Sequence, residues 1–417
     1  MKKIDVLFQG WGHEWVLGTL ASSGPHLVFE YSPEALQRGI EFSQVHLPLR
    51  AAAYSDFPAH LFGLPGLVSD ALPDGWGLLL MDKMFLKIGR SRSSITALDR
   101  LGFIGARAMG ALSFRPSLDM PLSADEATLL EIANAAADVI DDKDTPALKL
   151  LALVGGSPHG VRPKALVQFD AVAGRVSTLE SSPGAPWLVK FPAQGEHKEV
   201  CAIEHAYAIM ARACGAEVPR TQYFDLAKDM AAFGVERFDR AGGMRVPVHS
   251  LAGALHADFR VPSLDYQTIL RATRAFTKDE TEVSKAFGRC VLNVVMNNRD
   301  DHAKNFAFRM DEKMQWKLAP LYDFTFNTGP RGWHQATVMG EGQAPGRSEL
   351  QKLAANCGVA PATATRIIDR VCAEASRMAS FLIDFDIRKA SRKAIVDAVN
   401  ANLRRCAASP AQYQRVR

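Results

Sequence analysis

The chain has 417 residues, of which 47% are hydrophobic and 23% are charged. This composition excludes a disordered or collagen-like chain, and the length predicts two to three domains whose cores need neither metal nor disulfide in order to fold. The formal net charge of +4 is too small to require a nucleic-acid partner.

Residues 1–120 contain four short runs of alternating or continuous apolar residues, separated by Gly, Ser and Pro clusters. These runs cover residues 4–8, 16–20, 27–31 and 108–114. They predict a β-rich subdomain over residues 1–120. Within it, the turn-rich residues 61–81 lead into an expected helix over residues 76–86.

Residues 121–248 contain both helical repeats and strand-like runs of apolar residues. Ser123 and Glu126 have the spacing of a capping box ahead of a helical repeat. Strand-like runs then follow at residues 164–169, 187–191, 221–226 and 230–237, and one helix is expected over residues 199–214. This pattern predicts an α+β lobe over residues 121–248.

Residues 249–417 have few strand-like runs, and their apolar residues recur at helical spacing. The expected helices cover residues 269–275, 283–295, 362–382 and 394–403. We therefore predict a helical C-terminal lobe and, for the whole chain, an α+β fold.

Six cysteines are scattered along the chain without a Cys-x-x-Cys pair. This usage is typical of free, buried thiols and favours a cytoplasmic location. No window approaches about 18 uninterrupted apolar residues, so we expect no contact with a membrane interior.

A dense polar segment lies between the helix at 283–295 and a strand expected at residues 306–309. It contains Asp300 and, five residues later, Asn305. Phosphoryl transfer uses a carboxylate to orient the attacking hydroxyl and an amide oxygen at this spacing to hold Mg²⁺. A solvated turn rich in Asx residues is the structural alternative.

Asp323 follows a short strand-like run and sits between the large side chains of Tyr322 and Phe324. An aspartate in apolar surroundings usually has a partner such as a metal ion. Asp323 is therefore a candidate second Mg²⁺ ligand, with a helix N-cap as the alternative.

Gly155, Gly156 and Ser157 precede the strand at 164–169. Glycine permits the close backbone approach that phosphate binding needs, although a plain hairpin loop would also explain the glycines. The Walker string is absent from the sequence. Ser157, in a loop over the γ-phosphate, is a candidate phosphorylation site.

Lys190 lies in a strand-like run, and Glu199 and Glu204 lie in the next helix. A strand lysine that is held by a helical glutamate and contacts the α and β phosphates of ATP is a recurring kinase arrangement, whereas a lysine at a strand edge is the alternative. The spacing does not choose between the two glutamates. Glu236 and Phe238 end the last strand, where a hinge would bind adenine through backbone groups.

The chain resembles the HipA-like serine/threonine kinases of bacterial toxin-antitoxin systems over nearly all of its length. The resemblance rests on residues 72–77 (Leu-Pro-Asp-Gly-Trp-Gly), 155–164, 235–240 and 300–306, followed by Tyr322-Asp323. It implies a two-lobed protein-kinase-like fold that binds ATP and Mg²⁺ and phosphorylates a serine or threonine of a protein, in known members an aminoacyl-tRNA synthetase. It also implies a small helix-turn-helix antitoxin as partner, with DNA bound through the antitoxin complex.

Carried over by position, the resemblance assigns the site residues. Asp300 matches the catalytic aspartate, and Asn305 and Asp323 match the metal ligands. The ATP-binding residues are Gly155, Gly156, Ser157, Lys190, Glu204, Glu236, Phe238 and His302, and Ser157 is also the autophosphorylation site. The family register favours Glu204 over Glu199.

The sequence departs from the founding pattern of the family in two places. The loop reads Gly-Val-Arg-Pro-Lys where that member has Gly-Ala-Gln-Glu-Lys, and Asp301 replaces a glycine. The register selects Asp300 over Asp301. We therefore expect Asp300→Ala to abolish transfer and Asp301→Ala to leave a measurable fraction.

Two other functions fit part of the sequence. A small-molecule kinase shares the Asp-x-x-x-x-Asn loop, and a catalytically silent module acting with a DNA-binding partner would use the basic C-terminal stretch. From Asp384 onward this stretch has eight basic against three acidic residues. A solvated helix face and tail is the alternative, and such charge runs are common on protein surfaces.

Overall fold

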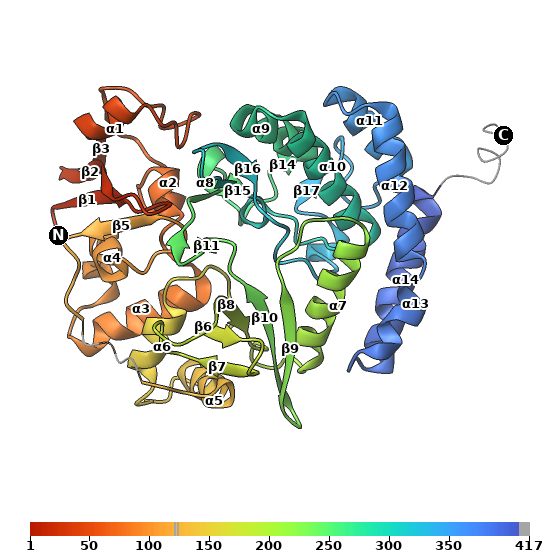
Figure 1. Ribbon diagram of the computed structural model, residues 1–417, viewed down its shortest axis with the longest axis horizontal. Coiled ribbons are helices and arrows are strands. Elements are labelled where there is room, and N and C mark those ends of the chain that lie inside the picture. The colour runs from red at the N-terminus through yellow and green to blue at the C-terminus, as the bar shows by residue number, and fades with distance from the viewer. Residues whose placement is uncertain (121, 123–124, 408–417) are drawn as a thin grey trace. The chain divides into compact units, whose positions relative to one another are not determined.

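The computed structural model describes residues 1–120, 122 and 125–407, which form a mixed structure of helices and strands with a β-rich N-terminal region (Figure 1). These residues cluster into two compact units. Unit 1 contains Met1–Cys201, Arg220–His256 and Arg309–Met314, and unit 2 contains Ala202–Pro219, Ala257–Phe308 and Gln315–Arg417. The division at residues 120 and 248 stays a prediction.

The first sheet of unit 1 has the strand order β4-β3-β2-β1-β5. Its strands are β1 (Lys3–Phe8), β2 (Trp15–Ser23), β3 (His26–Tyr31), β4 (Ala53–Tyr54) and β5 (Leu112–Arg115). The neighbours pair antiparallel. Ile4, Val6 and Phe8 are fully buried at alternate positions of β1, which is the period-two pattern that predicted the strand.

The strand expected at residues 108–114 begins only at Leu112. Gly110 has a φ of 72°, and the carbonyl groups of Ala108 and Gly110 accept hydrogen bonds from the guanidinium of Arg245. The first half of the run is therefore a turn whose backbone acceptors are used by a side chain.

Four short helices surround this sheet or follow it. They are α1 (Pro33–Arg38), α2 (Gly66–Ser69), α3 (Gly75–Lys87) and α4 (Ala97–Ile104). Helix α3 confirms the expected helix at 76–86, and Trp76, Leu80 and Met84 form part of its buried face. Helix α4 begins with a capping box between Thr96 and Asp99.

The second sheet of unit 1 has the order β7-β6-β8-β10-β9, with β8 at its centre (Figure 1). Its strands are β6 (Lys164–Asp170), β7 (Arg175–Ser177), β8 (Ala185–Lys190), β9 (Thr221–Ala227) and β10 (Met230–Glu236). These bounds confirm the four strand-like runs. Smaller elements of this unit are β11 (Arg240–Ala241), β12 (Met244–Arg245), β13 (Val248–Ser250) and α8 (Leu251–Leu255).

Two helices pack against this sheet. Helix α5 (Leu129–Ile140) contacts β9 and β10, and α6 (Leu148–Gly155) contacts β6 and α3. Helix α5 begins after Thr128, which forms a capping box with Glu131. The capping box expected at Ser123 and Glu126 does not begin this helix, and Ser123 lies outside the described residues.

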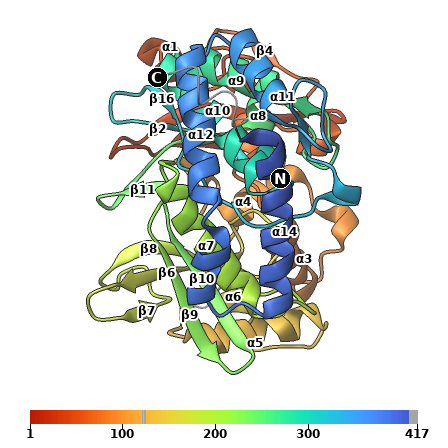
Figure 2. The ribbon, with the colours of Figure 1, turned by 90° about the vertical axis from the view of Figure 1, so that its right-hand side faces the viewer.

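Unit 2 is mainly helical. Its elements are most of α7 (Glu199–Ala213), then α9 (Tyr266–Thr277), α10 (Glu280–Val295), α11 (Arg347–Asn356), α12 (Pro361–Ala375), α13 (Met378–Phe381) and α14 (Lys389–Cys406), with the strands β14 (Leu264–Asp265), β16 (Trp316–Leu318) and β17 (Ala336–Thr337). Strand β15 (Ala307–Met310) begins in this unit. Helix α10 packs against α9, α12 and α14, and α12 lies beside α14 (Figure 2).

The helix expected over residues 362–382 is two helices. Helix α12 ends at Ala375, and α13 begins at Met378. The Oγ of Ser376 donates to the Ala373 carbonyl at 2.7 Å, which gives the chain a local alternative to the continued helical ladder. The other expected helices of this region, at 269–275, 283–295 and 394–403, are confirmed.

All six cysteines are free and buried, as the sequence predicted. Burial raises the pKa of the Cys406 thiol to about 11 and that of the Cys214 thiol to about 12. Within the described residues, no helix combines the length and the apolar character that crossing a membrane demands.

Candidate active site

The candidate catalytic loop begins where α10 ends. Met296 caps that helix, and Asn297 then adopts a left-handed φ of 55°, which turns the chain out of the helix. Asn297 and Arg299 bond to the backbone of Asn327: Asn327 N donates to the Asn297 carbonyl at 3.1 Å, and Arg299 N donates to the Asn327 carbonyl at 3.2 Å. Hydrogen bonds therefore join residues 297–299, just before Asp300, to Asn327 in the same unit.

Asp301 is a buried anchor of this loop. It is 0% exposed, and its carboxylate accepts hydrogen bonds from the Tyr266 hydroxyl (2.8 Å), from the Gln335 and Ala336 backbone amides (2.8 and 3.2 Å) and, at 2.8 Å, contacts His334 Nδ1. Asn293 Nδ2 extends the network by donating to the Tyr266 hydroxyl. The carboxylate of Asp301 is therefore committed to the interior of unit 2.

Asp300 differs from its neighbour because its side chain is 43% exposed. His302 Nε2 lies 3.7 Å from Asp300 Oδ1, and the His302 ring lies 5.5 Å from the ring of Phe259. Of the two adjacent aspartates, Asp300 is the one whose carboxylate is accessible to solvent.

Asn305 closes the loop back on Asp300. Its side-chain Nδ2 donates to the Asp300 carbonyl at 2.6 Å, and its backbone N donates to the His302 carbonyl at 2.9 Å. Because the amide nitrogen is used in this way, the amide oxygen is oriented away from that bond and can serve as a ligand. Asn305 is 8% exposed, so its position is fixed by packing as well.

Asp323 lies in the same unit and is tied to the loop by its neighbour. The Tyr322 hydroxyl donates to the Lys304 carbonyl at 2.5 Å. The ring centroids of Phe324 and Tyr207 are 5.5 Å apart. Asp323 itself has a left-handed φ of 54°. A carboxylate and an amide oxygen are hard donors of the kind that Mg²⁺ takes, so Asn305 and Asp323 fit this ion chemically.

In unit 1, the glycine-rich segment begins later than the sequence suggested. Gly155 is the last residue of α6 rather than part of a loop. A methyl group at Gly155 would lie 2.5 Å from the Lys164 carbonyl oxygen and 2.8 Å from Trp76 Nε1, so the close packing of α6 already explains this glycine. Gly156 follows as the helix cap. We call residues 156–163 the glycine-rich loop below.

Ser157 is 2% exposed, and its Oγ has no hydrogen-bond partner among the described residues. A buried hydroxyl without a partner is costly, which marks this position as one that another state or a ligand would satisfy. Gly160, in the same loop, has a φ of 105°, a conformation that favours glycine.

Lys190 ends the central strand β8 and is 8% exposed. Directly opposite it on β6 is Lys164, which is 4% exposed. Like charges at directly opposed positions are destabilising unless negative charge lies nearby. Lys164 also donates from Nζ to the His159 carbonyl, so its ammonium group lies against the glycine-rich loop. Our sequence reasoning did not assign Lys164 to the site, although its position after the loop was a usable signal.

Both candidate partners of Lys190 lie on α7 and are buried. Glu199, at the helix start, is 3% exposed and belongs to unit 1, whereas Glu204 is 2% exposed and belongs to unit 2. The choice of Glu204 stays a prediction.

The expected hinge follows β10. The carboxylate of Glu236 accepts two hydrogen bonds from the Arg220 guanidinium at 2.7 and 2.8 Å, and this contact lowers the pKa of Glu236. Because its side chain is engaged, Glu236 would contact a nucleotide through its backbone. Phe238 is half-buried two residues later.

The predicted site residues therefore form two groups. Unit 2 contains Glu204, Asp300, His302, Asn305 and Asp323, and unit 1 contains Gly155, Gly156, Ser157, Lys190, Glu236 and Phe238. The sequence did not indicate the network of Asn293, Tyr266 and His334 around Asp301, because its members are far apart along the chain. An asparagine in the last turn of an apolar helix was the one local sign of it.

Two family models match the chain. The model of the HipA N-terminal domain covers residues 9–115, and that of the HipA-like C-terminal domain covers residues 156–379, which is more than half of the chain. The chain belongs to the HipA-like family. No curated protein sequence matches this HipA-like chain significantly.

Two solved structures were compared with this fold. A chain from the Shewanella oneidensis MR-1 toxin-antitoxin complex of HipA, HipB and operator DNA is 16% identical, with 96% of each chain covered and a TM-score of 0.68. This similarity shows that the HipA-like chain has the same fold. The Helicobacter pylori proinflammatory kinase CtkA is 10% identical, with 54% of this chain and 85% of that chain covered, and its TM-score of 0.41 is too low to support an argument.

Proposed function

We propose that this HipA-like chain is an ATP- and Mg²⁺-dependent serine/threonine protein kinase and the toxin of a toxin-antitoxin pair. The observation that carries the proposal is the division between two adjacent aspartates. Asp301 is fully buried and anchors the loop, while Asp300 is 43% exposed and is bound through its carbonyl to Asn305. A positioned carboxylate five residues before a rigid amide is the arrangement that phosphoryl transfer uses.

The residues have separate chemical roles in this proposal. Asp300 accepts the proton of the substrate hydroxyl while the hydroxyl oxygen forms a bond to the γ-phosphorus. The bond between the γ-phosphorus and the β–γ bridging oxygen breaks, and ADP leaves. Asn305 and Asp323 would hold Mg²⁺, which neutralises charge on the phosphate oxygens when it is bound.

Lys190 binds phosphate oxygens, and we add Lys164 to this role. Lys164 and Lys190 are buried at opposed positions of β6 and β8, so they place two ammonium side chains on neighbouring strands, where the phosphates of ATP could bind both. We also propose the two-lobed kinase-like arrangement that the family resemblance implies, with Glu236 and Phe238 at the adenine. Glu204, His302, Gly155 and Gly156 complete the proposed ATP site.

Ser157 is the proposed autophosphorylation site. Its hydroxyl is buried, so phosphate transfer to it requires the glycine-rich loop to open. The bulk and charge of a phosphate at a 2% exposed position would keep the loop open afterwards. Phosphorylated protein is therefore expected to bind ATP weakly.

The proposed partners follow from the family. The similar HipA was solved with HipB and operator DNA. We propose a small helix-turn-helix antitoxin for this chain, DNA contact through that complex, and a protein substrate such as an aminoacyl-tRNA synthetase.

Phosphopeptide mass spectrometry tests the proposal. Purified protein is incubated with Mg²⁺ and labelled ATP, alone and with a cell extract, and the experiment is repeated with Asp300→Ala. Label on a serine or threonine of an extract protein, absent with the variant, is the expected result. Label on a metabolite alone would establish a small-molecule kinase instead, and saturable ATP binding without any transfer would contradict a kinase.

A further inference from the structure

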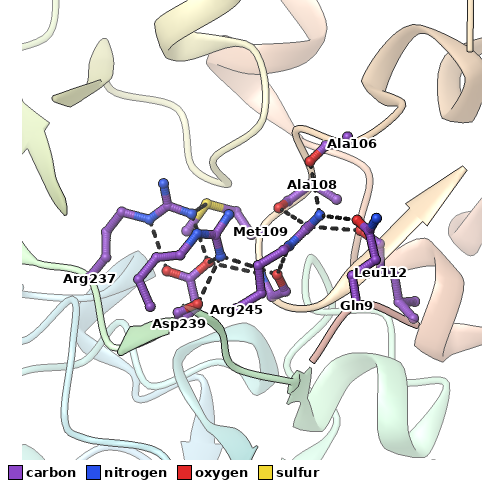
Figure 3. Close-up of polar contacts among 10 residues, drawn as sticks. Gln9, Ala106, Ala108, Met109, Leu112, Arg237, Asp239 and Arg245 are labelled. Atoms are coloured by element: carbon purple, nitrogen blue, oxygen red, sulfur yellow. Dashed lines mark hydrogen bonds and ion pairs between the residues drawn. The ribbon is translucent and has the colours of Figure 1, made fainter. Parts of the chain in front are cut away.

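Arg245 connects the segment after the hinge to the N-terminal subdomain, both within unit 1 (Figure 3). Its guanidinium donates hydrogen bonds of 2.8–2.9 Å to five oxygen atoms. They are Gln9 Oε1 and the carbonyl oxygens of Ala106, Ala108, Gly110 and Leu112. Burial lowers the pKa of Arg245 to about 10, yet the group stays charged at neutral pH. Only a planar fork of donors can satisfy so many acceptors at once.

Asp239 makes the second connection between the same segments. Its Oδ2 accepts from the Gly110 backbone N at 2.8 Å, and its carboxylate pairs with Arg237 and Arg240 (Figure 3). Asp239 is 3% exposed. The residue directly after Phe238 is thus bonded to the turn at Gly110, so hydrogen bonds join the hinge segment to residues 106–112. We call this set of contacts the hinge contact.

Residues 72–77, the Leu-Pro-Asp-Gly-Trp-Gly motif, hold the glycine-rich loop in a similar way. The Gly160 backbone N donates to Asp74 Oδ1, and Trp76 N donates to the Gly160 carbonyl at 3.0 Å. His159 Nε2 lies 2.8 Å from the Leu72 carbonyl oxygen. Loop and motif therefore exchange hydrogen bonds in both directions. We call this set the loop contact.

The loop contact also leaves no space for side chains. A methyl group at Gly75 would lie 2.7 Å from the Gly160 carbonyl oxygen and 2.8 Å from the Val161 Cα. Trp76 Nε1 donates to the Lys164 carbonyl at 3.1 Å, beside the lysine that follows the loop. Gly75 and Trp76 of the motif thus serve the close approach of this loop.

We infer that the N-terminal subdomain positions the nucleotide in this protein, by holding the glycine-rich loop through Asp74 and the hinge through Arg245. This inference rests on the proposed ATP site. Neither residue touches the reacting atoms, so both are positioning residues. Their loss should weaken nucleotide binding while leaving the rate of transfer from bound ATP largely intact.

Asp74→Ala tests the loop contact, and Asp74→Asn, which keeps an acceptor oxygen, is its conservative counterpart. Hydrogen exchange of the Gly160 amide is expected to quicken about tenfold in Asp74→Ala, since its acceptor is gone. The dissociation constant of Mg-ATP should rise about tenfold, the usual effect of losing a charge-assisted hydrogen bond. Asp74→Asn should restore most of both.

A matched control is Asp170→Ala. The Asp170 carboxylate also accepts from backbone amides in a loop, those of Val172 and Ala173 at 3.0 Å, but that loop is outside the proposed site. The control should change neither the exchange of Gly160 nor the affinity for Mg-ATP. Circular dichroism of every variant identifies any that fails to fold.

Arg245→Lys tests the hinge contact, because lysine keeps the charge and loses the fork. Amide exchange over residues 236–245 should quicken, and the Mg-ATP dissociation constant should rise about fivefold, with kcat changed less than about twofold. Arg38→Lys is the control, since Arg38 makes an exposed fork with Glu34.

The outcomes separate this inference from the proposed function. If wild-type protein binds no ATP, the proposed function fails, and the positioning role fails with it even where exchange quickens. If wild-type protein binds ATP and the variants change neither exchange nor affinity, the positioning role alone is wrong. Quicker exchange with unchanged affinity likewise overturns it, and a fall in kcat without a change in affinity does so too.

Discussion

Two residues of the candidate site, Phe238 in the hinge and Asp300 in the catalytic loop, are each followed directly by a buried aspartate. Asp239 is held by the arginines at 237 and 240 and by one backbone amide. Asp301 is held by a tyrosine hydroxyl, a histidine and two backbone amides. In both places a buried aspartate anchors the chain directly after a residue that is proposed to face a ligand. The difference lies in the donors, which are charged at the hinge and mostly neutral in the catalytic loop.

Replacing Asp300 should have the largest effect of any change in this comparison. Asp300→Ala removes the proposed proton acceptor and should lower phosphotransfer about 10³-fold or more. Because the side chain is 43% exposed, the melting temperature should hardly change. Initial rates with labelled ATP and thermal denaturation measure the two effects. A variant that keeps its full rate would remove Asp300 from the catalytic role.

Asp301→Ala should affect folding more than chemistry. It leaves the buried Tyr266 hydroxyl and His334 without their acceptor, so the free energy of unfolding should fall by about 3–5 kcal/mol. Chemical denaturation measures the loss. Phosphotransfer per folded molecule should remain measurable. A variant that has normal stability but no phosphotransfer would assign the catalytic role to Asp301 and not to Asp300.

Asp239→Ala should cost less, about 2–3 kcal/mol of unfolding free energy. The arginines that it leaves are not fully enclosed, because the side chains of Arg237 and Arg240 are 8% and 14% exposed. They can therefore recover part of their hydration. Denaturant titration of Asp239→Ala and Asp301→Ala compares their losses of unfolding free energy. A loss in Asp239→Ala that equals or exceeds the loss in Asp301→Ala would contradict the prediction.

Acid should weaken the hinge contact. Burial alone would raise the pKa of Asp239, but the charges of Arg237 and Arg240 hold it well below its ordinary value. A carboxyl whose folded pKa is depressed contributes stability above its unfolded pKa of about 3.9, and this contribution is lost as pH falls toward the folded pKa. The unfolding free energy should therefore fall below about pH 4, less steeply in Asp239→Asn. If the unfolding free energy of the wild type and of Asp239→Asn fell equally steeply with pH, this prediction would be wrong.

The smallest effect is expected at the exposed pair of Arg220 and Glu236. The Arg220 side chain is 63% exposed, so Arg220→Ala should change the unfolding free energy by less than about 1 kcal/mol. It should leave Mg-ATP affinity unchanged, because Glu236 is proposed to act through its backbone. Calorimetric titration checks this, and a large loss of affinity would assign the Glu236 side chain a direct part.

Much of this molecule follows from local sequence patterns. The strands that line the proposed site, the long helices and the burial of the cysteines all rest on periodicities of two or 3.6 residues. The spacing to Asn305 favours Asp300 over Asp301, and this choice stays a prediction. The break after Ala375 and the turn at Gly110 could not be predicted in this way, because side-chain bonds from Ser376 and Arg245 override the apolar pattern.

The anchors of the site were also beyond local patterns. Asp301 depends on residues 35 positions before it and about as many after it, and Arg245 depends on Gln9. Local sequence patterns do not show which groups far apart along the chain will form hydrogen bonds in the folded protein. Lys164 is an intermediate case: its place after the loop was visible, but its position opposite Lys190 depended on the register of two strands.

The burial of every native thiol makes this protein convenient for site-directed labelling. All six cysteines are buried, and burial raises the thiol pKa of Cys214, Cys290, Cys357, Cys372 and Cys406, so these thiols carry little reactive thiolate. Val161, in the glycine-rich loop, is 81% exposed. A cysteine introduced there by Val161→Cys would be the fastest thiol in the chain to take a spin label or a fluorophore. Opening and closing of this loop could then be followed spectroscopically without first removing the native cysteines.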